Sequence, residues 1–562
     1  MHIFEHFKYE RPNPEEIQKV FALKIAHLKK AKNAKAFLLI INQIEKLRAT
    51  TDSMIVLADI RFKINTKDDF YVKEHAFCDK LIPLMQDLSK DYFEVIVNSK
   101  FRDDFTKKYG TNVISIMKKS LQTIQPEVLS LLERENMLKS EYTKLLSSAQ
   151  FDFKGKNMTM GELRALFTSK DRETRKLAQE KFSDFFKEKE KDFDELFDKL
   201  VHLRHEIAVI LGYHNFIELG YDRLGRVDYG SRDVKQLQTY AKEIYIPFVN
   251  KIREWQKEQL HIDRLYYYDD PFYFNEEIVL KGDFSYILKE VEKTFTHMGV
   301  ESRRFFTFMV KRHLLDLLPK KSKLDWGFCH FIKTEKSPFI FMNYAGSAKN
   351  LLTLYHESGH ALSDFINRNK TFWEWNMVGL ETGEIHSSTM EFFSWPYANR
   401  ITAKPELFKL SGFLDATLFI PYGLLVDSFQ HWVYENPNAS IADRKKQWRV
   451  LEKVYLPHRN YEENAFLDRG NFWFRQLHIF EMPFYYVDYV IAYFCAFQYL
   501  FKSKENFVKA WKDYIQLIKS AVTYGFHDTL LRGNLEDPFQ KNTIQKITLK
   551  LDTLFQELSK NI

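Results

Sequence analysis

The stretch EEIQKVFALKIAHLKKAKNAKAFLLIINQIEKLRA, residues 15–49, decides the fold class of the first part of the chain. Its apolar residues recur every three or four positions, which is the spacing of one face of an α-helix. The same pattern continues from Pro14 to about Ser148. We therefore expect helices packed on helices.

The composition of the whole chain also favours long helices. The 562 residues include only 19 Gly and 15 Pro, against 51 Phe, 29 Tyr and 9 Trp. Both breakers fall well below their average usage of about 7% and 5%, which excludes collagen-like, linker-like and low-complexity classes. A β-sandwich is disfavoured because it needs a turn about every ten residues. We predict a mainly α-helical protein.

Three glycines lie close together in this glycine-poor chain, at Gly212, Gly220 and Gly225. Such a cluster indicates helix ends and tight approaches. We place an approximate boundary near it, between an N-terminal helical lobe at 1–200 and a second helical lobe at 201–562. The absence of linkers and repeats predicts that the two lobes are intimately packed.

Charge and cysteine content bear on the partners and the cellular setting. The 83 basic and 76 acidic residues give a net charge of +7 and are interleaved, so nucleic-acid binding is not expected. Three widely spaced cysteines favour a reducing compartment. Neither a signal peptide nor a run of 18 uncharged apolar residues is present. We expect a cytoplasmic protein that does not bind a membrane, and its oligomeric state stays open.

Two stretches depart from the helical pattern. QFDFKGKNMTMGELRALF, residues 150–167, predicts a short hairpin and then a helix with Thr159 as its N-cap and Glu162 in the third position. WGFCHFIKTEKSPFIFMNY, residues 326–344, predicts a second hairpin that runs directly into the next helix. A small β element should therefore lie beside that helix.

That helix, LLTLYHESGHALSDFI, contains His356, Glu357 and His360 as an HExxH motif. Residues i and i+4 share one helix face, so the two imidazoles can converge on one metal ion. Glu357 lies about 100° around the helix from His356, where it can face a water on that ion without being a ligand. The flanking residues are apolar, and burying this group without a metal would be costly. We predict one zinc ion.

A catalytic zinc needs a third protein ligand, and Glu381 and Glu384 are the candidates. The metzincin pattern is excluded because Ser363 and Ile366 occupy its Gly and His positions. Glu384 and Glu391 stand seven residues apart, on one helix face that can meet the HExxH helix. Spacing therefore favours Glu384 over Glu381 as the ligand, with Glu391 as the acceptor that orients a ligand histidine.

The motif HESGH, followed by GEIHSSTME at 383–391 and HIFEMPFYYVDY at 478–489, resembles the oligoendopeptidase F and thimet oligopeptidase family of zinc peptidases. The resemblance extends over most of the chain. It implies an elongated two-lobed helical body with a deep central channel that admits short peptides and excludes folded proteins. It also implies site roles for five residues: zinc binding by His356, His360 and Glu384, activation of the zinc-bound water by Glu357, and support of the ligands by Glu391.

In the resembling family, a histidine and tyrosines from the third motif lie over the scissile carbonyl, where they stabilise the oxyanion. His478, Tyr485 and Tyr489 are the candidates here, the two tyrosines being one helical turn apart. Tyr486 is the alternative because the register is uncertain, and we otherwise assign it to substrate binding. Most other rings of this stretch are expected to belong to a core helix.

Two further segments have possible contacts with substrate. SPFIFMNYAG, residues 337–346, is placed to offer a strand edge to an extended peptide, and Ala345 and Gly346 are small enough for close approach. Three basic residues at 458, 459 and 469 can line the cleft, although structural ion pairs are the favoured interpretation.

Together these features predict a zinc-dependent endopeptidase that hydrolyses internal bonds of short oligopeptides. A zinc carboxypeptidase of the helical HExxH type is one alternative, and it would need a basic residue for the terminal carboxylate. A non-catalytic peptide-binding scaffold with an inert metal site is the other.

Overall fold

The computed structural model of the chain describes residues 2–324, 327–370, 372 and 379–560. Helices make up 72% of it and strands 4%, which confirms the mainly α-helical prediction. The helices are α1 (Pro14–Lys29), α2 (Ala34–Ile64), α3 (Asp69–Val97), α4 (Arg102–Tyr109), α5 (Thr111–Thr123), α6 (Leu129–Ser147), α7 (Met160–Ala165), α8 (Arg172–Glu188), α9 (Glu190–Ile210), α10 (Phe216–Arg223), α11 (Ser231–Tyr240), α12 (Ile246–Gln259), α13 (Phe284–Met298), α14 (Val300–Lys311), α15 (Ala348–Asn367), α16 (Leu380–Phe393), α17 (Pro405–Glu435), α18 (Ile441–Tyr455), α19 (Leu477–Glu481), α20 (Tyr486–Ala521), α21 (Phe526–Arg532) and α22 (Lys541–Ser559).

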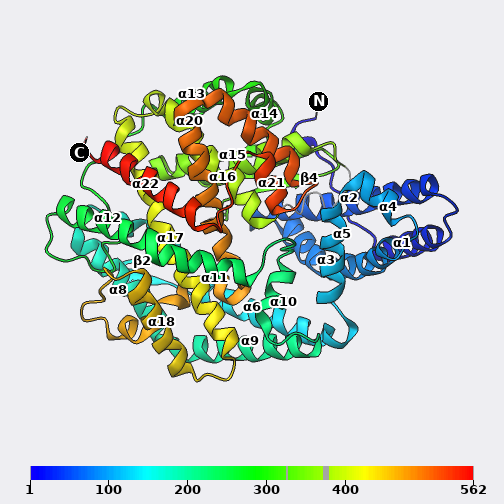
Figure 1. Cartoon of the computed structure of the whole chain (residues 1–562), viewed down its shortest axis with the longest axis horizontal. Helices are drawn as coiled ribbons and strands as arrows, with labels where there is room; N and C mark the ends of the chain where they lie inside the picture. Colours follow the sequence, from blue (N-terminus) through cyan, green and yellow to red (C-terminus); the bar gives the residue numbers. More distant parts are fainter. Residues whose placement is uncertain (1, 325–326, 371, 373–378, 561–562) are drawn as a thin grey trace.

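The molecule consists of a rounded helical body from which α1–α5 project as an arm (Figure 1). Apolar side chains of the arm, such as Phe21, Ile41 and Tyr92, form a small core of their own. A second and larger core runs through α6–α22. The lobe boundary near residue 200 stays a prediction.

The clustered glycines have the predicted kinds of role. Gly212 and Gly225 follow α9 and α10 with φ of +83° and +70°, a region of backbone conformation that favours glycine. Gly220 lies inside α10, where a Cβ atom would come within 2.7 Å of the Phe484 ring. The last contact joins α10 to the turn that precedes α20.

The first hairpin has the predicted form. Strands β1 (Phe151–Phe153) and β2 (Lys156–Met158) pair antiparallel, and α7 follows directly. Thr159 caps α7 by accepting a hydrogen bond from the Glu162 backbone, while the Glu162 side chain accepts one from Thr159 N. The predicted N-cap and its partner are both confirmed.

The second sheet has the strand order β3-β5-β4, with β3 at Leu315–Asp316, β4 at Phe328–Ile332 and β5 at Ser337–Phe341. The expectation that 337–346 supplies the free edge is wrong for its strand portion, because β5 is the buried central strand. The two-residue strand β3 covers it on the side opposite β4. The outer strand of the hairpin is β4. Trp326, where the hairpin was expected to begin, lies outside the described residues.

Among the described residues, one helix has the length and hydropathy needed to cross a membrane, namely α17. Its most apolar 18-residue window has a mean hydropathy of 1.3, and 78% of that window is buried within the protein. The helix therefore contributes its apolar surface to the core.

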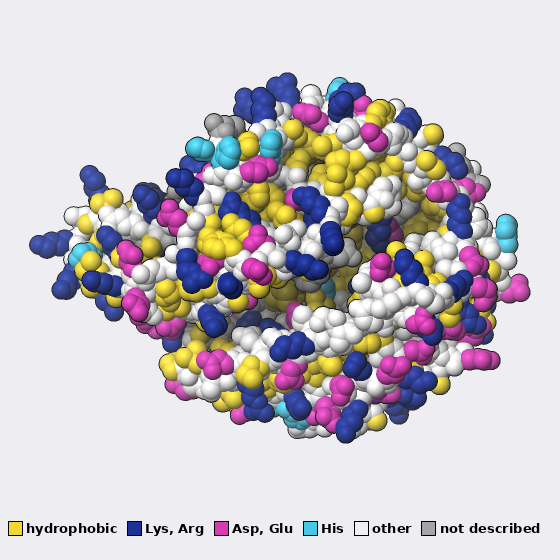
Figure 2. All heavy atoms as spheres, turned by 180° about the vertical axis from the view of Figure 1, so that it is seen from behind, with side chains coloured by type: hydrophobic (Ala, Val, Ile, Leu, Met, Phe, Trp, Pro, Cys, Tyr) yellow, Lys and Arg dark blue, Asp and Glu magenta, His cyan; other side chains and the backbone are white. Residues whose placement is uncertain are grey.

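The face opposite to that of Figure 1 is hollowed, with hydrophobic side chains in its depth (Figure 2).

Candidate metal and peptidase site

The HExxH motif lies in the middle of α15, as the spacing predicts. The N-cap of this helix is Ser347, which accepts a hydrogen bond from the Asn350 backbone, while the Asn350 side chain accepts from Ser347. The helix start is thereby fixed immediately after the hairpin. The imidazole rings of His356 and His360 lie 5.1 Å apart on one face of the helix.

Helix α16 packs directly on α15, and glycine makes the close approach possible. A Cβ atom at Gly359 would lie 2.5 Å from the backbone oxygen of His386 and 2.6 Å from Cα of Ser387. No real Cβ atom tolerates such distances from backbone. Gly359 thus brings α16 near enough for its side chains to meet the two histidines.

His356, His360 and Glu384 come together around one point. One ligand atom from each lies within 4.8 Å of the others. Oε2 of Glu384 is 3.3 Å from Nε2 of His356 and 3.7 Å from Nε2 of His360. Zinc bonds of about 2.0–2.1 Å in a tetrahedron require ligand separations of roughly 3.3–3.4 Å. The donor set therefore fits a zinc ion in both chemistry and spacing.

The ligands are supported by neighbours on α16. Nδ1 of His356 lies 2.7 Å from Oε1 of Glu391, so the ring nitrogen that faces away from Glu384 has a carboxylate partner. The hydroxyl of Ser387 donates to Oε2 of Glu384 at 3.0 Å. Such outer contacts fix the orientation of metal ligands. The histidines are 23% and 27% exposed, so the site is open to solvent.

Glu381, the rival third ligand, lies elsewhere. Its carboxylate accepts hydrogen bonds from Tyr229 at 3.1 Å and from Thr382 at 2.9 Å, in a buried polar group that includes Arg226 and Asp488. It is absent from the set of side chains that converge with the two histidines. The structure therefore places the favoured residue, Glu384, with the two histidines and keeps the alternative, Glu381, apart from them.

Glu357 is buried next to the ligands and has a free carboxylate. Within the described part of the chain it makes no hydrogen bond or ion pair, although the charges of His360 and His356 act on it. Burial raises its pKa above the usual value of a glutamate. A carboxylate without partners beside a metal site is available to accept a proton.

Two of the predicted tyrosines lie at the site. The hydroxyl of Tyr485 donates to Oε1 of Glu384 at 2.9 Å, and the hydroxyl of Tyr489 donates to that of Tyr485 at 3.0 Å. Both residues come from the start of α20, one turn apart. The structure thus places a chain of two hydroxyl groups against the third ligand.

His478 lies beside these tyrosines, 5.4 Å from the ring of Tyr485 and 4.9 Å from that of Tyr486. Burial lowers its pKa to about 4, so the ring is neutral near pH 7. Gln476 donates through Nε2 to Nδ1 of His478 at 2.8 Å and accepts from the Tyr422 hydroxyl at 3.1 Å. Since Nδ1 accepts, the proton of the neutral ring is on Nε2, which can donate.

The predicted substrate residues are more dispersed. The Tyr486 ring packs among Phe419, Tyr422 and His478 rather than on Glu384. Ala345 and Gly346 are exposed in the turn before α15, and Gly346 has φ of +87° with open space around its Cα. Their roles in substrate binding stay predictions.

Carboxylates contact the three basic residues of uncertain role. Arg459 is paired with the half-buried Asp270 and with Glu452, and Arg469 is paired with Glu190. His458 hydrogen-bonds to Asp270, but burial lowers the pKa of His458 to about 4, so its ring is neutral near pH 7. The interpretation as structural ion pairs therefore holds for the two arginines, and His458 has a structural hydrogen bond instead.

Sequence reasoning did not assign roles to Ser387 and Gln476. Ser387 stands three residues after Glu384 on the same helix, so helical spacing contained a signal for its contact. Gln476 lies two residues before His478, and nothing in the local sequence indicates that their side chains meet.

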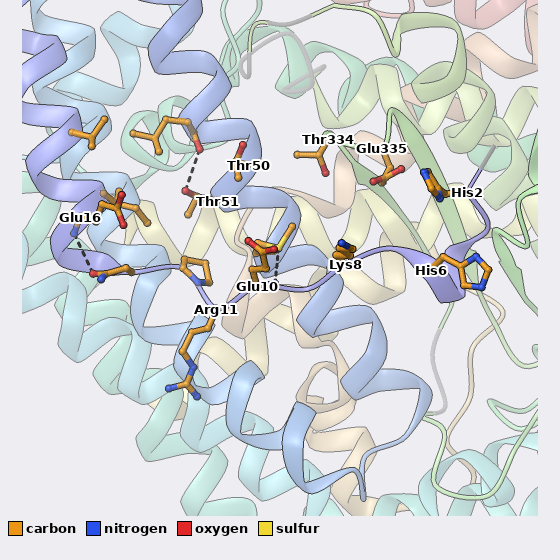
Figure 3. Close-up of a pocket in the computed structure, with 16 residues that line it drawn as sticks. His2, His6, Lys8, Glu10, Arg11, Glu16, Thr50, Thr51, Thr334 and Glu335 are labelled. Carbon is orange, nitrogen blue, oxygen red and sulfur yellow. Dashed lines mark hydrogen bonds between the residues drawn. The ribbon is translucent and has the colours of Figure 1, made fainter.

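A separate surface cavity of about 480 Å³ lies between the segment before α1, helix α2 and the β4–β5 turn (Figure 3). His2, Lys8, Thr50 and Glu335 are among its lining residues. None of the residues of the metal site lines it. We therefore assign it no part in the chemistry of that site.

Two histidines and a glutamate around one point, with a free carboxylate on the next residue and hydroxyl donors opposite, define a metallopeptidase site. The comparisons agree with this class. The model of peptidase family M3 matches residues 165–520, and the model of the peptidase M3 N-terminal domain matches residues 4–124. The chain belongs to peptidase family M3, a metallopeptidase family.

Individual relatives point the same way. The oligoendopeptidase F homolog of Borreliella burgdorferi is 23% identical over 419 residues, which cover 69% of this chain and 68% of the relative. The solved structure of PZ peptidase A with an inhibitor has a TM-score of 0.93 and 38% identity, and the match covers 99% of both chains. Oligoendopeptidase F from Enterococcus faecium, at 15% identity, a TM-score of 0.63 and coverage of 97% and 98%, shows the shared fold alone. The protein is thus a metallopeptidase of the oligopeptidase type.

Proposed function

We propose that the protein is a zinc-dependent endopeptidase that cleaves internal bonds of short peptides. The observation that carries the proposal is the convergence of His356, His360 and Glu384 beside the carboxylate of Glu357, which no described residue engages in a hydrogen bond or ion pair. When bound there, zinc would polarise a peptide carbonyl and activate water for attack. The free cysteines of the described chain support our proposal of a reducing, cytoplasmic setting.

The residues of the chain divide the work of hydrolysis between them. Glu357 takes a proton from the attacking water and delivers it to the leaving amine. The hydroxyl of Tyr485 turns from Glu384 toward the carbonyl oxygen as negative charge develops there, and Nε2 of His478 supplies a second donor. The hydroxyl of Tyr489 keeps Tyr485 in place. Glu391 holds the ring of His356 in its orientation.

The experiment is cleavage of internally quenched peptides that are blocked at both ends, with the cut sites mapped by mass spectrometry. Cuts at internal bonds are expected. Cleavage restricted to peptides with free C-termini would favour the carboxypeptidase alternative instead.

The Glu357→Gln variant separates an enzyme from a binding scaffold. It should retain zinc, because Glu357 is not among the converging ligands, and lose turnover by about 10²- to 10⁴-fold. Unchanged turnover would refute the proposed mechanism.

A further inference from the structure

Two arginines that have no acidic partner among the described residues lie on the same aromatic ring near the proposed site. The guanidinium carbon of Arg164, on α7, is 5.2 Å from the centre of the Phe182 ring, and that of Arg475 is 4.6 Å from it. Phe182 itself is fully buried on α8. The ring therefore brings together two cations from segments about three hundred residues apart.

Neither arginine is neutralised by the described part of the chain. Among the described residues, Arg475 hydrogen-bonds only to the uncharged Gln179, through Nη1 at 3.4 Å, and its buried Nη2 has no hydrogen-bond partner there. No ion pair of Arg164 or Arg475 occurs among the described residues. Arg459, which lies on the other aromatic neighbour of Arg475, Phe472, is by contrast paired with two carboxylates.

The two guanidinium groups and the Phe182 ring between them border a space that we call the recess. Arg164 is exposed to solvent there, and Arg475 is only partly exposed. Burial lowers the pKa of Arg475 to about 10, so it remains a cation at neutral pH. A buried guanidinium nitrogen without a partner, such as Nη2 of Arg475 within the described part of the chain, is costly, and an anion that enters the recess would offset that cost.

The recess adjoins the proposed catalytic donors. Arg475 is followed directly by Gln476, whose side chain bonds to His478, and His478 lies beside Tyr485. The Tyr422 hydroxyl, which donates to Gln476, also lies close enough to both arginines to influence them electrostatically. A peptide bound at the site could therefore extend toward this pair.

We propose that Arg164 and Arg475 form a subsite for a carboxylate of the bound peptide, beyond His478 as seen from the metal ligands. The inference rests on the proposed peptidase function and adds a specificity determinant to it. Guanidinium groups bind carboxylates through paired charge-assisted hydrogen bonds. The carboxylate comes either from the free C-terminus of a short peptide or from an Asp or Glu side chain, and the test has one arm for each source.

The first measurement is kcat/KM of the metal-loaded enzyme on two pairs of internally quenched peptides. One pair differs only in a free or amidated C-terminus. The members of the other pair are both amidated at the C-terminus and differ only by Glu against Gln at one position after the cut. This comparison is repeated for each position after the cut. In at least one pair the acidic member should be preferred by roughly 10- to 100-fold, the range for a hydrogen-bonded charge.

Substitutions then locate that preference. Arg164→Ala and Arg475→Gln should each reduce the ratio of acidic to neutral substrate by about tenfold or more. Arg469→Ala is the matched control, since it removes an arginine whose charge is already paired on the surface, and it should leave the ratio as in the wild type. Arg164 is exposed, so its substitution should not prevent folding even where that of Arg475 does.

The outcomes separate this inference from the function on which it rests. Efficient cleavage of all four kinds of peptide with no preference for acidic members overturns the subsite and leaves the peptidase function standing. A preference that survives Arg164→Ala also overturns it. If no peptide is cut, the affinities of the Glu357→Gln variant for the acidic and neutral peptides of each pair are compared instead. Equal affinities reject the subsite. Tighter binding of the acidic peptide that is lost when Arg164→Ala is added supports it.

Discussion

The hydroxyl of Tyr485 donates a hydrogen bond to Oε1 of Glu384, at 2.9 Å. The contact joins the start of α20 to α16, so the proposed oxyanion donor and the proposed third metal ligand are linked by one hydrogen bond. Oε2 of the same carboxylate faces the two histidines. Tyr485 is therefore positioned both to orient the ligand and to act on a substrate carbonyl above it.

The Tyr485→Phe variant distinguishes these two roles. We expect kcat to fall by about 10²- to 10³-fold, as for loss of one oxyanion donor, while zinc affinity changes little because Ser387 still holds Glu384. Steady-state kinetics and metal titration measure the two effects. A loss of zinc with normal kcat in the zinc-saturated enzyme would assign Tyr485 to ligand orientation alone.

Glu391→Gln tests the support of His356. The neutral amide is a weaker acceptor for Nδ1 of the imidazole, so zinc affinity should fall by about 10- to 100-fold. Competition with a chelator of known affinity measures the change. Zinc affinity equal to that of the wild type would show that the 2.7 Å contact does not serve the metal.

Gly359→Ala should disrupt the site without touching a ligand. The added methyl group would meet the backbone of His386 and Ser387 on α16, which cannot move aside cheaply. We expect a loss of stability of about 1–3 kcal/mol and weaker zinc binding, since α16 must move away from α15. Gly383→Ala is the control: its methyl group meets nothing within 4 Å, so denaturation midpoints should stay equal or rise.

Asp59 on the arm contacts one histidine within the arm and one on the body. Asp59 on α2 accepts from His75 on α3 at 3.2 Å and from His330 on β4 at 3.0 Å. The hydrogen bond that His75 donates to Asp59 raises the pKa of His75 despite partial burial. The stabilising contribution is therefore fully present below the unfolded pKa of about 6.5 and is lost as pH rises through the higher folded value.

His75→Gln should accordingly lower the thermal midpoint more at pH 6 than at pH 9, by the equivalent of about 1 kcal/mol or less because the pair is partly exposed. His214→Gln, at an exposed position, serves as the control with no such trend. A destabilisation by His75→Gln that does not vary with pH would contradict the assigned contact.

Much of the site follows from helical spacing within single segments. The four-residue interval of His356 and His360 and the seven-residue interval of Glu384 and Glu391 each place side chains on one face, and α15 and α16 do present those faces to each other. Gly220 and Gly359 also stand at close approaches, to the ring of Phe484 and to the backbone of α16 respectively. Spacing within a single helix fixes which side chains share a face, so these contacts can be predicted wherever the helix itself is predicted correctly.

The remainder depends on contacts between distant segments. The strand β5 became central because two residues at 315–316 pair with it, which no local pattern signals. Glu381 is bound by Tyr229, about 150 residues earlier, and Arg475 meets Arg164 only through the ring of Phe182. Such partners are set by tertiary packing, so the sequence pattern contains no signal for them.

His356, His360 and Glu384 are proposed to hold one catalytic zinc ion. The most direct measurement is removal of metal by a chelator, followed by titration with zinc while cleavage of an end-blocked quenched peptide is recorded. Activity should vanish on removal and return linearly to its full value at one equivalent of zinc per chain, whereas Glu384→Ala should not recover. Full activity in the metal-free protein, or equal recovery by Glu384→Ala, would contradict the claim.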